Sequence, residues 1–77
     1  MNYYFINKIA ENNGDYEVHK VDCNFLPDDS DRLYLGVFSN CKEAMIKAKE
    51  IYDQSNGCYN CCSECYTVNE NKVIWST

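Results

Sequence analysis

Two stretches near the start of the chain show the alternation of apolar and polar residues that is typical of β-strands. Residues 2–9 carry aromatic and β-branched side chains on both parities, which predicts a strand with apolar groups on both faces. Residues 16–21 predict a second strand, with the even-numbered side chains on one face and the odd-numbered ones, His19 among them, on the other. Asn13-Gly14 lies between the two and is a strong hairpin signal. The chain is therefore expected to open with a β-hairpin.

A loop and a third strand are expected after the hairpin. Residues 22–32 contain the only proline and an acidic run, so they predict a loop, and its Phe25 and Leu26 are expected to pack against the core. Residues 33–38 are almost continuously apolar and predict the third strand. Gly36 within this strand indicates a β-bulge or a close approach of two backbones.

A helix is the element that the pattern predicts most strongly. Ser39 or Asn40 is expected to cap its N-terminus, with Glu43 in the capping-box position. Apolar residues then recur at helical spacing and form one stripe: Ala44, Met45, Ala48, Ile51 and Tyr52. Asn56-Gly57 predicts the end of the helix, because glycine suits the left-handed position that follows a last turn.

The last part of the chain completes the predicted fold. Residues 66–68 and 73–75 predict a short closing hairpin or a last strand that joins the sheet. The whole pattern predicts one small domain over residues 1–77, of the α+β class. Its expected parts are a small antiparallel sheet of about three strands, one helix packed across the sheet, and a C-terminal cysteine knuckle.

Length and charge narrow the possible functions. A chain of 77 residues builds a modest core, and a domain of this size is commonly stabilised by disulfides or a metal. The six cysteines are the groups that could supply such cross-links. The formal net charge of -5 and the lack of a basic cluster argue against nucleic-acid binding. An acidic surface instead favours another protein, with basic groups, as the partner.

The compartment decides between metal and disulfides. The N-terminal sequence has no basic leader, no long apolar run and no small-residue cleavage site, and no window of the chain is apolar enough to cross a membrane. A cytoplasmic protein is therefore expected, and in the cytoplasm clustered cysteines more often hold a metal. A disulfide-stabilised secreted protein whose leader has been removed is the alternative, since its mature sequence would look the same.

Two short motifs carry the candidate metal site. Cys58-x2-Cys61 follows the predicted helix, in a loop that can turn both sulfurs to one side. His19-x3-Cys23 lies at the end of the second predicted strand and supplies the other half of a tetrahedral set. Thiolate and imidazole ligands at this spacing favour zinc. The predicted cofactor is therefore one zinc ion, and it would connect the first hairpin to the chain beyond the helix.

The register of the cysteine cluster leaves alternatives open. Cys62-x2-Cys65 is an equally good frame, so Cys62 and Cys65 are alternate metal ligands. A site built only from Cys58, Cys61 and this second pair would be crowded, because adjacent cysteines point in different directions in most backbone conformations. Disulfides and free thiols remain the other reading of the cluster.

A family resemblance can be stated on these motifs. Residues 18–65 present His-x3-Cys, a Leu-Pro loop, Leu-Gly-x-Phe, a capped helix with Ala-x3-Ala, and Gly-Cys-x2-Cys. This order resembles the zinc-binding module of the Ada DNA-repair protein, and more closely short uncharacterised bacterial Cys-rich proteins that look similar to it. The resemblance implies that His19, Cys23, Cys58 and Cys61 are zinc ligands. In Ada the first ligand is a cysteine that accepts a methyl group from DNA phosphate, and here His19 takes that place, so the resemblance implies zinc without the repair chemistry.

The remaining cysteines suggest a second functional hypothesis. Cys41 lies in the first turn of the predicted helix, where the helix dipole can lower the pKa of a thiol. Together with Cys62 and Cys65 it could serve a thiol-based redox or metal-sensing protein. Packing of Cys41 beneath the helix is the simpler reading. The leading expectation is a non-enzymatic zinc-binding domain that binds another protein, because four protein ligands leave no open position for catalysis.

Overall fold

A computed structural model describes residues 1–67 of the chain. In order, its elements are β1 (Asn2–Asn7), β2 (Tyr16–Lys20), the 3-10 turn η1 (Asp29–Asp31), β3 (Arg32–Phe38), α1 (Cys41–Ile51), β4 (Ser55–Gly57) and the 3-10 turn η2 (Ser63–Cys65). The closing hairpin predicted after the cysteines lies, beyond residue 67, outside the described residues. No helix within the described range is both long and apolar enough to cross a membrane.

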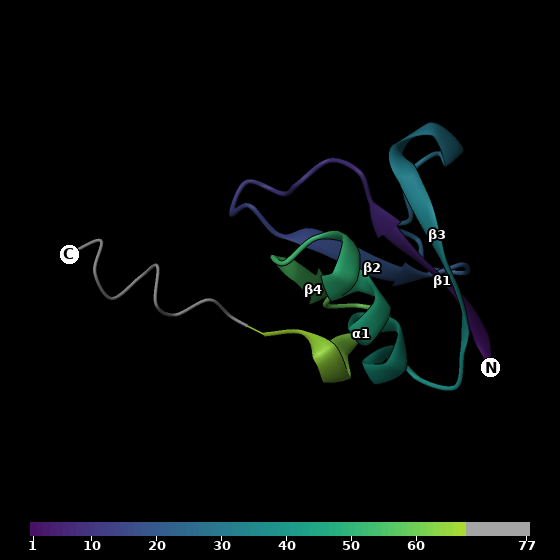
Figure 1. Ribbon diagram of the computed structural model, residues 1–77. Coiled ribbons are helices and arrows are strands. Elements are labelled where there is room, and N and C mark those ends of the chain that lie inside the picture. The colour runs from purple at the N-terminus through teal and green to yellow at the C-terminus, as the bar shows by residue number, and fades with distance from the viewer. Residues whose placement is uncertain (68–77) are drawn as a thin grey trace.

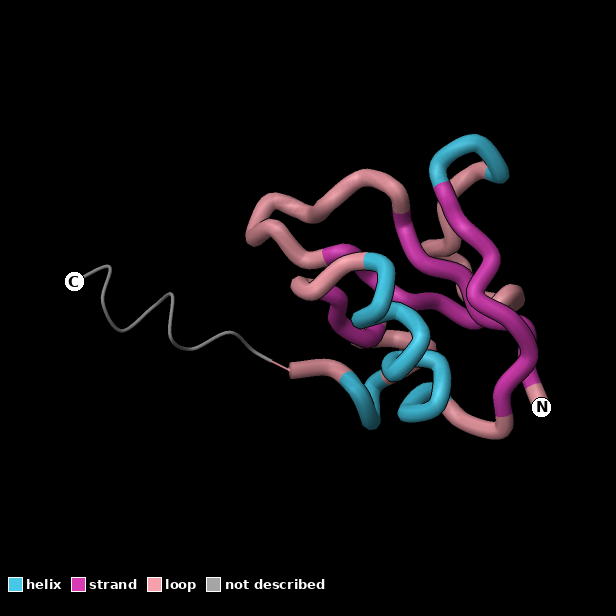
Figure 2. Tube along the Cα trace, viewed as in Figure 1, coloured by secondary structure: helices cyan, strands magenta, loops and turns pink. Residues whose placement is uncertain are grey.

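The strands form one mixed sheet in the order β3-β1-β2-β4 (Figures 1 and 2). β1 is antiparallel to both β2 and β3, while β2 and β4 are parallel. The α+β class is confirmed, with one α-helix among the described residues. The prediction of about three antiparallel strands was wrong in one respect, because a fourth, parallel strand lies beside β2.

β4 occupies the residues that were predicted to end the helix. α1 ends at Ile51, and Tyr52 already has extended backbone angles. Ser55–Gly57 then pairs with β2, with Val18 opposite Gly57. Gly57 does not have a positive φ, so its predicted left-handed role was wrong. The helix thus ends earlier than predicted, and residues 52–54 connect it to β4 at the edge of the sheet.

The other glycine predictions are confirmed. Gly14 has φ +91° in the loop between β1 and β2, where a residue with a side chain would be strained. Gly36 has φ +137°, and the register of β3 against β1 shifts at Tyr4 and Phe5, beside Gly36. Such a register shift is a β-bulge, which bends the edge strand.

The predicted helix cap is also confirmed. The Asn40 side chain accepts a hydrogen bond from the Glu43 backbone N–H at 3.1 Å. The Glu43 carboxylate in turn accepts one from the Ser39 N–H at 3.1 Å. Of the predicted stripe, Ala44 and Ala48 are fully buried, whereas Ile51 is 40% exposed because it lies in the last turn.

One face of the sheet packs against α1 and contains the core. Its fully or almost fully buried side chains come from three strands, the helix and the cysteine loop: Tyr4, Ile6, Val18, Leu35, Cys41, Ala44, Ala48 and Cys62. Phe25 does not belong to this core, contrary to prediction, and is 62% exposed. The Leu26 backbone N–H donates to the Cys23 carbonyl oxygen at 3.2 Å, which closes a turn within this loop.

Candidate metal centre

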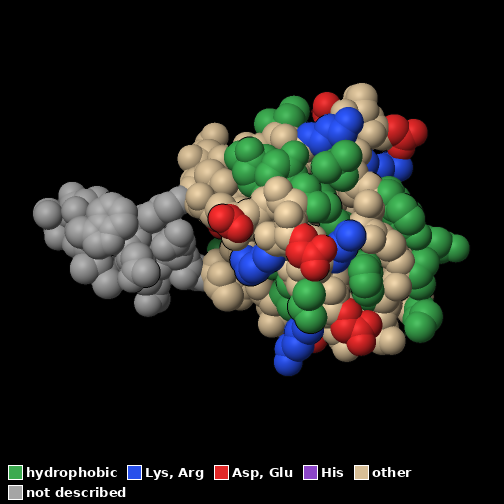
Figure 3. Space-filling view, viewed as in Figure 1, with side chains coloured by type: hydrophobic (Ala, Val, Ile, Leu, Met, Phe, Trp, Pro, Cys, Tyr) green, Lys and Arg blue, Asp and Glu red, His purple; other side chains and the backbone are tan. Residues whose placement is uncertain are grey.

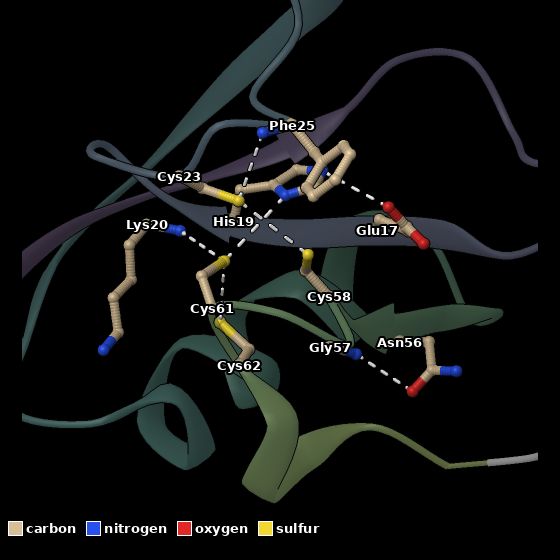
Figure 4. A network of polar contacts seen from close by, with 10 residues as sticks. All are labelled: Glu17, His19, Lys20, Cys23, Phe25, Asn56, Gly57, Cys58, Cys61 and Cys62. Atoms are coloured by element: carbon tan, nitrogen blue, oxygen red, sulfur yellow. Dashed lines mark hydrogen bonds and ion pairs between the residues drawn. The ribbon is translucent and has the colours of Figure 1, made fainter.

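The two predicted halves of the metal site meet because β2 and β4 are parallel neighbours. The ends of parallel strands lie at the same edge of a sheet, so the residues that leave them come together. His19 is near the end of β2 and Cys23 lies in the turn beyond it, while Cys58 and Cys61 lie in the loop directly after β4. Figure 4 shows these four side chains converging from the two segments.

The distances among the four side chains suit a tetrahedral ion. One ligand atom from each of His19, Cys23, Cys58 and Cys61 lies within 4.8 Å of all the others. The Cys23 and Cys58 sulfurs are 3.8 Å apart, and the Cys61 sulfur is 3.9 Å from His19 Nδ1. Ordinary zinc bond lengths in a tetrahedron require about 3.8 Å between two sulfurs and about 3.6 Å between sulfur and nitrogen. The donor set therefore fits zinc without a large rearrangement.

Backbone N–H groups donate to the sulfurs of Cys61 and Cys23. Lys20 N–H donates to Cys61 Sγ at 3.3 Å, and Phe25 N–H donates to Cys23 Sγ at 3.4 Å. Burial raises the pKa of Cys58, and the backbone N–H groups of Cys61 and Asn60 act in the opposite direction. Hydrogen bonds of this kind stabilise a thiolate more than a neutral thiol, because they are charge-assisted. The backbone is thus arranged for negatively charged sulfur ligands.

Burial separates the ligands into an inner and an outer pair. His19 is 0% exposed and Cys58 is 3% exposed, while Cys23 and Cys61 are half-buried. An opening of about 320 Å³ lies against this outer pair; its lining includes Lys20 and Phe25. An ion could therefore reach the centre past the two outer sulfurs.

The surroundings hold each ligand in its uncharged form when no metal is bound. Burial lowers the pKa of His19 to about 4, so its imidazole is neutral at pH 7. Burial raises the pKa of Cys58 to about 11 and also raises the pKa of Cys23. The pKa of Cys61 is raised too, first by its contact with the Cys62 sulfur and then by burial. A cation would compensate for the desolvation of all three thiolates.

The histidine ring presents its two nitrogens to different neighbours. Nδ1 faces the Cys61 sulfur, within the ligand cluster. Nε2 is buried and makes no hydrogen bond within residues 1–67, but it lies 3.4 Å from a carboxylate oxygen of Glu17. Burial, and then the nearby Glu11 and Asp15, raise the pKa of Glu17. The sequence analysis missed Glu17, although strand alternation places it on the same face as His19.

The two alternate ligands do not join the cluster. Cys62 is 1% exposed and packs in the core, although its sulfur lies 3.8 Å from that of Cys61. Cys65 is joined by a disulfide to Cys41, across a Cα separation of 6.5 Å. Burial of Cys41 beneath the helix agrees with the simpler of its two predicted roles. The pairing of Cys41 with Cys65 was not predicted.

Gly57 sets the path of the loop that carries Cys58 and Cys61. A Cβ atom at this position would lie 2.7 Å from the Cys62 carbonyl oxygen and 2.8 Å from the Cys65 Cβ. The loop after β4 folds back over Gly57 at this close range. Glycine is therefore required here for space, and not for a positive φ.

Asn56 holds β4 in place beside the centre. Its Oδ1 accepts hydrogen bonds from the backbone N–H groups of Gly57 and Thr67, at 2.9 and 3.0 Å. Its Nδ2 donates to the Thr67 carbonyl and to the buried Asp15 carboxylate. A three-residue strand gains little from its own ladder, so this side chain supplies much of the polar anchoring.

Comparisons with protein-family models, with curated proteins and with solved structures find no match to this chain. The resemblance to the Ada module therefore stays a prediction from short motifs. The candidate metal centre rests on the geometry of its own four side chains.

Proposed function

We propose that this chain is a non-enzymatic zinc-binding domain and that the ion cross-links β2 to the loop after β4. The observation that carries the proposal is the convergence of one imidazole and three thiols within 4.8 Å, at tetrahedral spacings. Four protein ligands close the coordination shell, which is typical of structural rather than catalytic zinc. When bound, zinc supplies a cross-link between segments far apart in the sequence.

Zinc binding is expected to release about three protons at pH 7. Cys23, Cys58 and Cys61 have raised pKa values and must lose their protons, whereas His19, with a pKa of about 4, has none to lose. Affinity should therefore fall steeply as the pH drops from about 8 to about 5, because protons compete for the thiolates. Titration calorimetry in buffers of different ionisation enthalpy gives the number of protons directly. A release of one proton or none would contradict a site with three thiolates.

The second part of the proposal is a protein partner with basic groups. The face of the sheet opposite α1 leaves Tyr3 and Tyr34 more than half exposed, and Val37 is 43% exposed. We name these residues, with Phe5, the open face; the strand register places all of them on one side. Acidic net charge favours a basic partner. Figure 3 shows the opposite side of the molecule, on which α1 lies, and there basic and acidic side chains are intermixed.

Replacing both exposed tyrosines, Tyr3→Ser and Tyr34→Ser, is expected to abolish capture of a specific partner. Both rings are more than half exposed, so the core and the zinc stoichiometry should be unchanged. The measurement is cross-linking capture from cell extract with the wild type and the double variant, at low and high salt. Equal capture by both proteins, or the absence of any salt-sensitive partner, would argue against this surface.

The redox alternative has two observations in its favour, the Cys41–Cys65 disulfide and the pKa of Cys62, which the contact with the Cys61 sulfur lowers. Cys41 and Cys62 are each only 1% exposed, however, so oxidants and partner thiols have little access to them. The disulfide thus fits a cross-link between α1 and η2 better than a sensor. The zinc domain stays the preferred function, and it requires that the three ligand thiols are reduced.

A further inference from the structure

We propose that Glu17 is a positioning residue for the metal centre, one whose carboxylate accepts a hydrogen bond from the Nε2–H of His19 and so presents Nδ1 to the ion. This inference rests on the proposed zinc function. It specifies that Nδ1 of His19 binds the ion, that the imidazole proton is on Nε2, and that Glu17 stabilises this tautomer.

The orientation of the His19 ring indicates which of its nitrogens would bind the ion. Nδ1 lies 3.9 Å from the Cys61 sulfur, at the separation of two ligands on one ion. A neutral imidazole has one lone pair and one N–H. Coordination through Nδ1 uses the lone pair there, so the proton must be on Nε2. The ring thus points its only remaining donor away from the cluster.

The surroundings of Nε2 indicate which residue would accept a hydrogen bond from it. This nitrogen is buried and has no hydrogen-bond partner among the described residues, which is costly for a polar group without water. The Glu17 carboxylate is the neighbour that faces it, at 3.4 Å, and both residues come from the same face of β2 (Figure 4). The Glu17 side chain is 28% exposed, so it has room to close the short gap to a hydrogen bond. Metal ligation by histidine is commonly supported by such a carboxylate.

The test compares two substitutions of Glu17 with a charge control. Glu17→Ala is expected to weaken zinc binding by about 10–100-fold in chelator competition. The zinc affinity of Glu17→Gln is expected to stay within a few fold of that of the wild type, because the amide oxygen can still accept a hydrogen bond from Nε2–H. Glu11→Ala removes one of the carboxylates that act on Glu17 electrostatically and should leave the affinity nearly unchanged. Rescue by glutamine separates hydrogen-bond acceptance from the effect of charge.

Spectroscopy of the wild type tests the same proposal without a substitution. In protein loaded with an NMR-active cadmium isotope and labelled on histidine, scalar coupling from the metal to Nδ1, and a protected proton on Nε2, are expected. Coupling to Nε2 instead, or an unchanged affinity of Glu17→Ala, would overturn the role of Glu17 while leaving the zinc function intact. Failure of the wild type to bind zinc or cadmium at all would overturn both.

Discussion

Cys58→Ser is expected to abolish binding of one equivalent of zinc and to lower the melting temperature of the metal-loaded protein by more than about 15 °C. Cys58 is the most buried of the three thiol ligands, and its sulfur lies 3.8 Å from that of Cys23. A serine hydroxyl is a poor ligand for zinc, so the stability that comes from binding is lost. At a free zinc concentration a thousand times the dissociation constant, that contribution is about 4 kcal/mol. Native mass spectrometry and thermal unfolding with and without chelator measure both effects.

Cys62→Ala is the matched control for this prediction. Cys62 is a neighbouring buried cysteine that lies outside the four-ligand cluster. Its replacement should cost on the order of 1 kcal/mol of packing and should keep one zinc per chain. The opposite result, with zinc retained by the Cys58 variant and lost by the Cys62 variant, would show that the alternate register of the cysteine motif is the true one.

Gly57→Ala is expected to destabilise the protein by about 3 kcal/mol, which corresponds to about 12–24 °C in melting temperature. The added methyl group would meet two backbone atoms, the Cys62 carbonyl oxygen and the Cys65 carbonyl carbon, at 3.0 Å or less. Backbone at this range cannot move aside as a flexible side chain can, so the loop that carries Cys58 must shift. Zinc affinity should fall together with stability. Chemical denaturation and chelator competition on the same variant measure the two losses.

Ser55→Ala, in the same short strand, should have the opposite or no effect. Ser55 is 7% exposed, and its hydroxyl makes no hydrogen bond in the part of the chain that the structure describes. Removing a buried, unpaired hydroxyl is expected to be neutral or to stabilise by up to about 1 kcal/mol. If both variants lost stability equally, the sensitivity would belong to β4 as a whole, and the close approach at Gly57 would not be its cause.

The parts of the fold that depend on local patterns could be predicted from the sequence. Asn40 and Glu43 mark the helix start because capping is a contact between residues close in the chain. The four side chains of the candidate metal centre were predicted to converge for a related reason. Each half, His19-x3-Cys23 and Cys58-x2-Cys61, is a local spacing, and only their meeting is a long-range event. Both motifs consist of residue types that bind zinc, so their residue types predicted that they would meet. The hydrophobic pattern alone does not predict this contact.

The features that were missed all depend on contacts between distant segments. β4 has the sequence Ser-Asn-Gly, which reads as the end of a helix; it becomes a strand because β2 pairs with it and Asn56 anchors it. Cys41 and Cys65 are 24 residues apart, and only the packing of η2 against α1 brings them together. Neither outcome follows from periodicity in a short window.

The cysteine loop, residues 58–65, contains two kinds of cysteine that need opposite chemical conditions. Cys58 and Cys61 in its first half must be reduced to hold the proposed ion, and Cys65 at its end is joined to α1 by a disulfide, which must be oxidised. A reducing environment opens the disulfide and leaves the thiolates free for the ion. An oxidising environment favours oxidation of the thiolates and preserves the disulfide. The cysteine loop thus keeps one of the two cross-links in either environment. A shift in redox potential would change whether its first half or its last residue can separate from the rest of the fold.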